Sequence, residues 1–328
     1  MKTTLIRSLF ALLLLALTDR LPAQVFEFDI FKTTVYHQTN AAPPVTPDFP
    51  NAYFFASKLI TDPSYNVTDI FVDSPLAEYS MQSNSTTFFT LNSPYFSTKT
   101  NFDAHYPSGE YDFDVSYLDV DGNSQDAYGY LIIPTQDLNA PNPAAFLTNC
   151  WPAMQQVYSG ADFTLQWNSY LLASGADTAA TFISVQDNAT GNVPYGKICA
   201  PDVTTAQIPA NSLLPGHSYT VNIVFSERNT TTGVGYGNAL NIVGFDNLTY
   251  TSLNTLPGLQ IAGAGANITL TWPHAATNYQ LQATGSLNTN AVWNIVTNLP
   301  VVISPYNVLT LPATNIQRFF HLVSIGQP

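Results

Sequence analysis

The sequence predicts an all-β protein made of antiparallel β-sandwich modules, and three observations lead to this fold class. Residues Tyr111–Tyr117 alternate apolar and polar side chains, the period of two that marks a half-buried strand. The same alternation recurs at 219–223, 268–272 and 279–282. The chain also has 23 Pro and 17 Gly but only four Glu and five Lys, so turns are frequent and strong formers of surface helices are scarce. Many short strands between turns are typical of sandwiches and barrels.

Two internal similarities predict that the strands are grouped into modules. The segment Ala161–Trp167 is repeated in kind by Ala266–Trp272, 105 residues later, and each copy ends in a Trp. The segment Tyr106–Phe113 is similar to Leu214–Val221, 108 residues later. Two unrelated landmarks with nearly equal periods indicate a repeated structural unit, in which Trp167 and Trp272 are expected to fill the cores.

We therefore expect three modules after an N-terminal signal peptide. Their joints are expected in two stretches rich in Pro, Asn or Gly, at 134–143 and 252–258. The expected modules are a first β-sandwich at 25–138, a second at 144–252 and a small C-terminal one at 256–326.

Residues 1–23 have the pattern of a signal peptide that is removed during export. Lys2 and Arg7 precede the apolar run Leu9–Leu17, and Leu21–Ala23 offers a small residue before Gln24. The apolar run is shorter than the roughly 20 residues that a membrane span requires. We expect an exported protein, extracellular, periplasmic or at the cell surface, with no membrane span after signal cleavage.

The two cysteines leave two interpretations open. In an exported protein, Cys150 and Cys199 can form a disulfide, which would close a loop of about 50 residues and stabilise the fold by roughly 4 kcal/mol. The alternative is a pair of inert, buried thiols. The sequence does not show whether the Cα atoms of the two cysteines lie close enough for a disulfide. We expect the disulfide.

The string Leu214–Val221 resembles the tyrosine corner of fibronectin type III domains and related sandwiches. In that family a Tyr near the start of a strand turns its hydroxyl back to the upstream backbone, and Tyr219 occupies this position. Tyr111 holds the same place in the first module. In immunoglobulin domains proper, two cysteines form a bridge around a Trp. Here Cys199 precedes the corner Tyr219 by twenty residues, which departs from that pattern. The module at 144–252 is therefore better described as fibronectin type III-like.

The overall layout is similar to that of uncharacterised secreted multi-β-sandwich proteins of environmental bacteria, which carry fibronectin type III-like or immunoglobulin-like modules. The matching residues of the last module are Leu270-Thr271-Trp272, Tyr279-Gln280-Leu281-Gln282, Trp293 and Arg318-Phe319-Phe320. These motifs are structural, so the resemblance implies a fold and no catalytic residue.

Composition excludes nucleic acid as a partner. Without residues 1–23 the chain has 6 basic and 21 acidic side chains, which cannot form a basic footprint for phosphates.

One oxygen-rich segment, 119–126, is a weak candidate for a calcium loop. Its oxygen ligands would be Asp119, Asp121, Asn123 and Asp126. An EF-hand loop requires a Gly at the sixth position, but Gly122 is fourth. A plain hairpin turn at Asp121-Gly122 is the favoured interpretation, and a calcium site is the alternative.

No motif for catalysis or cofactor binding is found, so we expect that the protein binds no cofactor and is not an enzyme. The five His lack zinc-binding spacing, and no nucleophile elbow is present. Asp112 and Asp114 share one face of a predicted strand, where solvated carboxylates are expected in any case. Trp151, Trp293, Tyr128 and Tyr130 are candidates for stacking on sugar rings, although packing explains each of them as well.

These observations predict a secreted or cell-surface, non-catalytic protein that acts in adhesion, matrix architecture or ligand binding. A carbohydrate-binding protein is the first alternative, and a glycan-active enzyme of unrecognised type is the second. Polysaccharides or other surface proteins are the partners considered, and the sequence does not choose between them.

Overall fold

The computed structural model describes most of the chain after the expected signal peptide, and residues 1–23 lie outside the described part. The described residues are 25–119, 121–138, 144–148, 150–230, 233–234, 239–274, 276, 279–304, 306–313 and 317–325.

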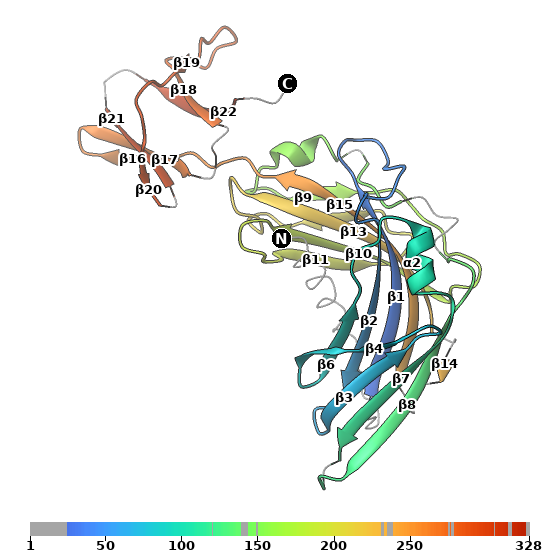
Figure 1. Ribbon diagram of the computed structural model, residues 1–328. Helices are drawn as coiled ribbons and strands as arrows, with labels where there is room; N and C mark the ends of the chain where they lie inside the picture. The colour runs from blue at the N-terminus through green and yellow to red at the C-terminus, as the bar shows by residue number, and fades with distance from the viewer. Residues whose placement is uncertain are drawn as a thin grey trace.

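The protein is all-β, and its largest element is an eight-stranded sheet (Figure 1). Two segments of its central strands, 181–187 and 221–227, are buried without a break. The strand expected to be half-buried at 219–223 is therefore covered on both faces over much of its length. In spatial order the strands are β11 (Tyr195–Cys199), β10 (Thr178–Asp187), β13 (Ser218–Asn229), β15 (Leu240–Asn254), β1 (Val25–His37), β2 (Tyr53–Thr61), β6 (Phe88–Asn92) and β5 (Gln82–Ser85).

The pairing of β1 with β15 joins the two halves of this sheet. It is parallel, with Phe31 opposite Gly244, whereas the other pairs in the sheet are antiparallel. The Phe31 ring lies against Gly244, where a Cβ would come within 2.3 Å of the ring atoms. The sheet therefore runs through both of the first two predicted modules without interruption.

Two smaller sheets cover one face of the large sheet. The two-stranded one is formed by β9 (Phe163–Gln166) and β12 (Thr205–Ile208). The five-stranded one has the order β14 (Gly233–Val234), β8 (Ser124–Ile133), β7 (Gly109–Leu118), β3 (Asn66–Asp73) and β4 (Glu78–Ser80).

Each pair of layers encloses a hydrophobic core that contains the landmarks seen in the sequence. In the first core Tyr111 is fully buried, and the ring of Phe113 packs edge-on against Phe28 with centroids 5.1 Å apart. In the second core Trp167 and Tyr219 are both buried.

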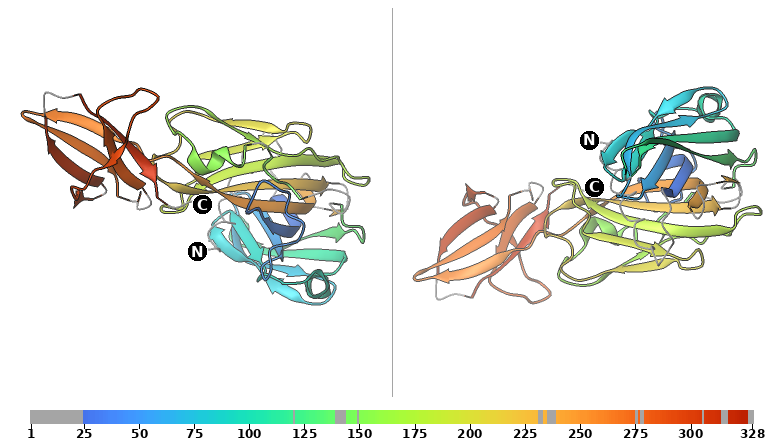
Figure 2. Two further views of the ribbon diagram at one scale, coloured as in Figure 1. Left: turned by 90° about the horizontal axis from the view of Figure 1, so that it is seen from above. Right: turned by 90° about the horizontal axis from the view of Figure 1, so that it is seen from below.

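The C-terminal part forms a separate small sandwich that projects from one end of the molecule (Figure 2). Its core contains Leu270, Trp272 and Leu309, all of which are buried. One layer consists of β16 (Gln260–Ala264), β17 (Asn267–Pro273), β21 (Tyr306–Pro312) and β20 (Val301–Ile303). The other consists of β19 (Asn294–Ile295), β18 (Tyr279–Thr284) and β22 (Phe319–Ser324).

Helical structure is limited to two short segments among the described residues, α2 (Lys99–His105) and the 3-10 turn η2 (Ala153–Gln156). The hydroxyl of Thr98 caps α2 by accepting from the backbone N–H of Asn101. No helix in this part of the chain is both long and apolar enough to cross a membrane.

The expected disulfide is not formed, because Cys150 and Cys199 are both free and buried. The Cys150 sulfur instead accepts the backbone N–H of Gln166 at 3.2 Å, which fixes it beside β9. Cys199 ends β11 in the opposing sheet. Both thiols belong to the second hydrophobic core, in which burial raises the pKa of each. The alternative of two buried thiols describes the structure.

Candidate functional site

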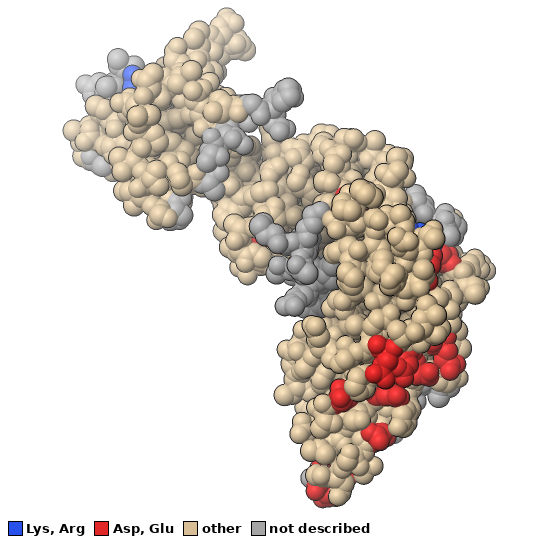
Figure 3. Space-filling model, in the orientation of Figure 1, with Lys and Arg blue, Asp and Glu red and all other residues tan. Residues whose placement is uncertain are grey.

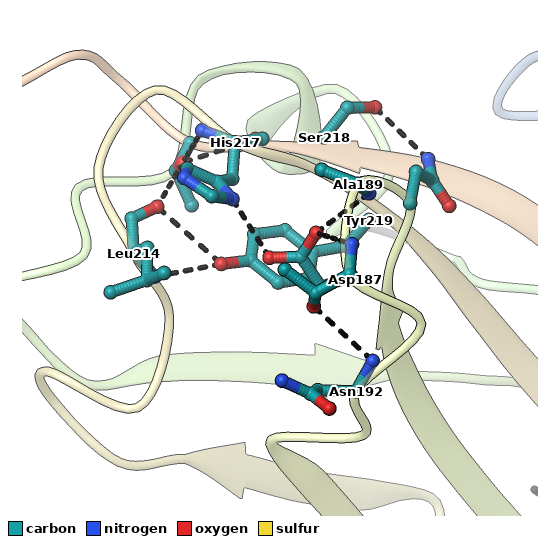
Figure 4. A network of polar contacts seen from close by, with 10 residues as sticks. Asp187, Ala189, Asn192, Leu214, His217, Ser218 and Tyr219 are labelled. Carbon is teal, nitrogen blue, oxygen red and sulfur yellow. Dashed lines mark hydrogen bonds and ion pairs between the residues drawn. The ribbon is translucent and has the colours of Figure 1, made fainter. Parts of the chain in front are cut away.

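The tyrosine corner that the sequence suggested has its hydroxyl turned to the upstream backbone (Figure 4). The N–H of Leu214 donates to the Tyr219 hydroxyl at 2.7 Å. In the first sandwich the Tyr111 hydroxyl donates to the carbonyl oxygen of Pro107 at 2.8 Å. Both side chains are held by their own upstream loops, so their role is structural.

The His217 side chain contacts a carboxylate beside this corner. Its Nδ1 lies 2.7 Å from Asp187 Oδ2 (Figure 4). Asp187 Oδ1 already accepts the backbone N–H groups of Ala189 and Thr190, at 2.8 and 3.2 Å. The carboxylate thus fastens the turn after β10 to the corner, a contact that requires His217 to donate or carry a proton.

The same corner contacts the start of the C-terminal sandwich. The His217 N–H donates to the hydroxyl of Thr255 at 2.9 Å. A Cβ on Gly216, whose φ is +73°, would lie 3.2 Å from the ring of Pro273. Gly216 is therefore required both for its backbone conformation and for this close approach.

The candidate calcium loop is a tight turn that uses its own carboxylate. Asp119 Oδ1 accepts the backbone N–H groups of Asp121 and Asn123 at 3.0 and 2.9 Å. These hydrogen bonds lower the pKa of Asp119, the bond from Asn123 most strongly. Gly122 adopts a φ of +81°, as the hairpin interpretation requires. Asp126 hydrogen-bonds to Ser116 at 2.7 Å, and no group of three or more metal-binding side chains occurs among the described residues.

A concentration of acidic side chains lies on the outer face of the five-stranded sheet (Figure 3). Asp112 lies directly opposite Asp73, and Asp73 lies directly opposite Glu78 on the next strand. Asp114 and Asp126 continue the cluster, and we refer to Asp73, Glu78, Asp112, Asp114 and Asp126 as the acidic face. The sequence placed Asp112 and Asp114 together, and the sheet adds three carboxylates from other strands.

The acidic face repels further negative charge. The pKa of Asp114 is raised by partial burial, and next by the charges of Asp73 and Asp112. Partial burial and Asp73 likewise raise the pKa of Asp112. The ion pairs of the described residues lie elsewhere, so no basic side chain neutralises the acidic face. Nearby cations or hydrogen-bond donors would favour the charged form of its carboxylates.

Two tyrosines border the acidic face. Tyr128 lies directly opposite Asp114, and Tyr130 lies directly opposite Asp112. The Tyr128 side chain is 67% exposed. The two tryptophan candidates lie elsewhere. Trp293 packs flat against His321 with ring centroids 3.8 Å apart, and the indole N–H of Trp151 donates to the Thr251 hydroxyl at 3.1 Å while its ring packs against the second core.

A buried ionic group within the large sheet was not found from the sequence. Lys58 Nζ lies 2.8 Å from Asp29 Oδ2 and 2.8 Å from Glu27 Oε1. Burial raises the pKa of Asp29 to about 8, with the Lys58 charge opposing the shift. The available signal was the position of Lys58, a charged residue within the apolar strand Tyr53–Thr61.

A second pair of charged residues lies on two other strands of the same sheet, with Asp246 on β15 and Arg228 on β13. Burial raises the pKa of Asp246 to about 6, opposed by its hydrogen bond with Ser226 and by the charge of Arg228. The Arg228 guanidinium carbon lies 4.8 Å from the ring centroid of Phe182 and 5.6 Å from that of Phe31. Each of these charged groups thus has a partner inside the fold.

No family model and no curated relative matches the chain. Among solved structures, the FN1–FN3 domains of chicken CNTN1 are similar over 93% of this chain and 94% of that chain, with 8% identity and a TM-score of 0.20. Fibronectin(III)-like modules of Clostridium thermocellum CbhA are similar over 68% and 90%, with 9% identity and a TM-score of 0.23. A Ca²⁺-stabilized adhesin of an ice-binding Antarctic bacterium is similar over 92% and 73%, with 10% identity and a TM-score of 0.23. At TM-scores this low the likenesses carry no argument about function, and the fold class rests on the sheets described above.

Proposed function

We propose that this chain is an exported, non-catalytic β-sandwich protein that acts in adhesion, matrix architecture or ligand binding, with the acidic face as its binding surface. The proposal is supported by a difference between the polar side chains that hold turns and those of the acidic face. Asp119, Asp187 and His217 hold turns in place. The carboxylates of the acidic face, in contrast, lie along the strands on the outer face of the five-stranded sheet, where Asp126 accepts a hydrogen bond from the Ser116 hydroxyl.

Such a face suits a partner with many donors or positive charges. A flat array of carboxylates gains little from one exposed ion pair, about 0–1 kcal/mol, so affinity would come from many simultaneous contacts. An extended polymer or a cell surface provides these contacts. The modules at 25–138 and 144–252, which share the eight-stranded sheet, and the module at 256–326 belong to this proposal as its scaffold.

Carbohydrate binding is the second candidate, and the placement of Tyr128 favours it. An exposed tyrosine ring opposite Asp114 combines a stacking surface with acceptors for sugar hydroxyls. Sugar binding would therefore use the same face.

Retention on polysaccharide columns tests both candidates. We expect the chain to bind a cationic polysaccharide such as chitosan, and the double variant Asp112→Asn, Asp114→Asn to bind it less. Asp202→Asn, an exposed carboxylate elsewhere, is the matched control. Retention on neutral cellulose that is lost in Tyr128→Ala would favour the sugar-binding form. Equal retention of all variants, or release of sugars from either polymer, would contradict the proposal.

A further inference from the structure

The C-terminal sandwich differs from the rest of the chain in charge. Residues 24–255 carry 21 acidic and five basic side chains, a net charge of −16. Residues 256–328 carry Arg318 alone and no Asp or Glu. Two copies of the chain therefore repel each other over most of their surface but not at this end.

The same sandwich exposes an unusual amount of apolar surface. Twenty large hydrophobic side chains are exposed in the described part of the chain, and ten of them follow residue 256. Residues 256–328 make up less than a quarter of the sequence. Scattered exposed hydrophobic residues are ordinary, but a concentration in one small module marks an interaction surface.

Several of these side chains form a continuous patch on the outer face of one sheet. Leu309 of β21 is in the core, so its neighbours Tyr306 and Val308 point to the opposite face, and Val308 lies directly opposite Val301. Ile303 lies directly opposite Tyr306. Val301, Ile303 and Tyr306 are 65%, 60% and 46% exposed. We call Val301, Ile303, Tyr306 and Val308 the C-terminal patch.

The remainder of this face is uncharged as well. Thr271 and Thr310 continue the rows of the patch across β17 and β21. The patch also reaches the sheet edge, because β20 is the last strand of its layer. Natural edge strands are usually protected by charged side chains, whereas β20 has none.

We propose that a second copy of this chain docks on the C-terminal patch through its own C-terminal patch, forming a symmetric dimer. A cationic partner would be drawn to the acidic face, whereas the C-terminal patch has no charged side chain that would attract a charged partner. An apolar, uncharged patch is complementary to itself, which is what a two-fold contact requires.

The position of the patch supports a tail-to-tail arrangement. The C-terminal sandwich projects from one end of the molecule (Figure 1), and the acidic face lies toward the other end (Figure 3). Contact through the patch keeps the two acidic faces apart, so their repulsion is smallest. The dimer would present two acidic faces at its far ends, although its formation does not depend on what they bind.

Sedimentation velocity over a range of protein concentrations tests the proposal with the chain lacking residues 1–23. We expect a reversible monomer–dimer equilibrium. The dimer should become tighter as salt is added, because salt screens the repulsion between the negatively charged residues 24–255 of the two copies. Ile303→Lys is expected to weaken the dimer by about tenfold or more, since it buries an unpaired charge in the interface. Leu76→Lys is the matched control, because Leu76 is 65% exposed in the other half of the chain and its variant should dimerise normally.

A second variant guards against a folding defect in Ile303→Lys. Thr310→Glu introduces a charge at an exposed position on the same face without touching the core, and it should weaken the dimer likewise. A chain that stays monomeric at all concentrations would overturn the proposal. The same holds if both patch variants dimerise as well as the unchanged chain, or if Leu76→Lys is as defective as they are.

Discussion

The backbone N–H of Leu214 donates a hydrogen bond to the hydroxyl of Tyr219, with the two atoms 2.7 Å apart. Tyr219 is buried in the second core, so its ring fixes the base of the corner while its hydroxyl fixes the loop. The corner carries further contacts, because His217 in the same loop binds Asp187 and Thr255. Tyr219 and His217 of this loop thus together connect the core, the turn after β10 and the segment that leads into the C-terminal sandwich.

Replacing Tyr219 by Phe tests the contribution of this hydroxyl. The variant keeps the ring but leaves the Leu214 N–H without its partner, so we expect a loss of about 1–2 kcal/mol in the free energy of unfolding. Urea unfolding followed by tryptophan fluorescence measures it. Tyr128→Phe removes an exposed hydroxyl and should leave the midpoint unchanged. Equal midpoints for Tyr219→Phe and the unchanged chain would show that the hydrogen bond has no net value.

The buried group around Lys58 predicts a dependence of stability on pH. The folded chain raises the pKa of Asp29 from 3.8 to about 8, so between these values it binds a proton more readily than the unfolded chain does. The contribution of Asp29 is therefore largest at low pH and is lost as pH rises toward 8, by at most about 1.4 kcal/mol per pH unit. In Asp29→Asn the fall in stability over this interval should be smaller. Parallel pH profiles for the two proteins would contradict the assignment.

Removing Lys58 tests the same group from the other side. The Lys58→Met variant leaves the buried Asp29 and the half-buried Glu27 without their cation, and breaking a buried ion pair in this way costs about 3–5 kcal/mol in other proteins. Chemical unfolding at neutral pH should show a loss of this size. Lys197→Met, in which the altered lysine is exposed on β11, is the matched control and should change little.

Repulsion within the acidic face predicts a stabilising substitution. The pKa of Asp114 is raised by partial burial and by the neighbouring carboxylates, so at neutral pH its charge destabilises the fold slightly. Asp114→Asn should raise stability by a few tenths of a kcal/mol at most, because the site is largely open to solvent. The gain should shrink at high salt, which screens the neighbouring carboxylates but not the cost of burial, and it should vanish below about pH 4, where the carboxylates are protonated. A gain that is the same at low and high salt would show that repulsion does not contribute.

The turn at Asp119 predicts that calcium has no effect on stability. Its carboxylate already accepts two backbone N–H groups, and Gly122 takes the hairpin conformation. The melting temperature should be the same in millimolar calcium and in chelator. A calcium-dependent rise that disappears in Asp119→Ala would instead establish the metal site.

The features that could be predicted from the sequence are those encoded locally. Alternation marked the strands around Tyr111 and Tyr219, because a period of two depends only on neighbouring residues. The parallel pairing of Phe31 with Gly244 joins segments more than two hundred residues apart, and no local pattern encodes it. The acidic face could be seen only in part, since Asp112 and Asp114 share a strand whereas Asp73 and Glu78 reach them through sheet pairing.

The arrangement of the cores predicts two unfolding transitions. The eight-stranded sheet joins the first two predicted modules, while the C-terminal sandwich has its own core around Leu270. Leu270→Ala should lower the free energy of unfolding of the C-terminal sandwich by about 2–5 kcal/mol, and so lower the midpoint of one transition and leave the other unchanged. Leu165→Ala, equally buried in the second core, should do the reverse. Calorimetry resolves the transitions, and a single cooperative unfolding that both substitutions shift alike would show that the corner at Gly216 and Pro273 couples the sandwiches firmly.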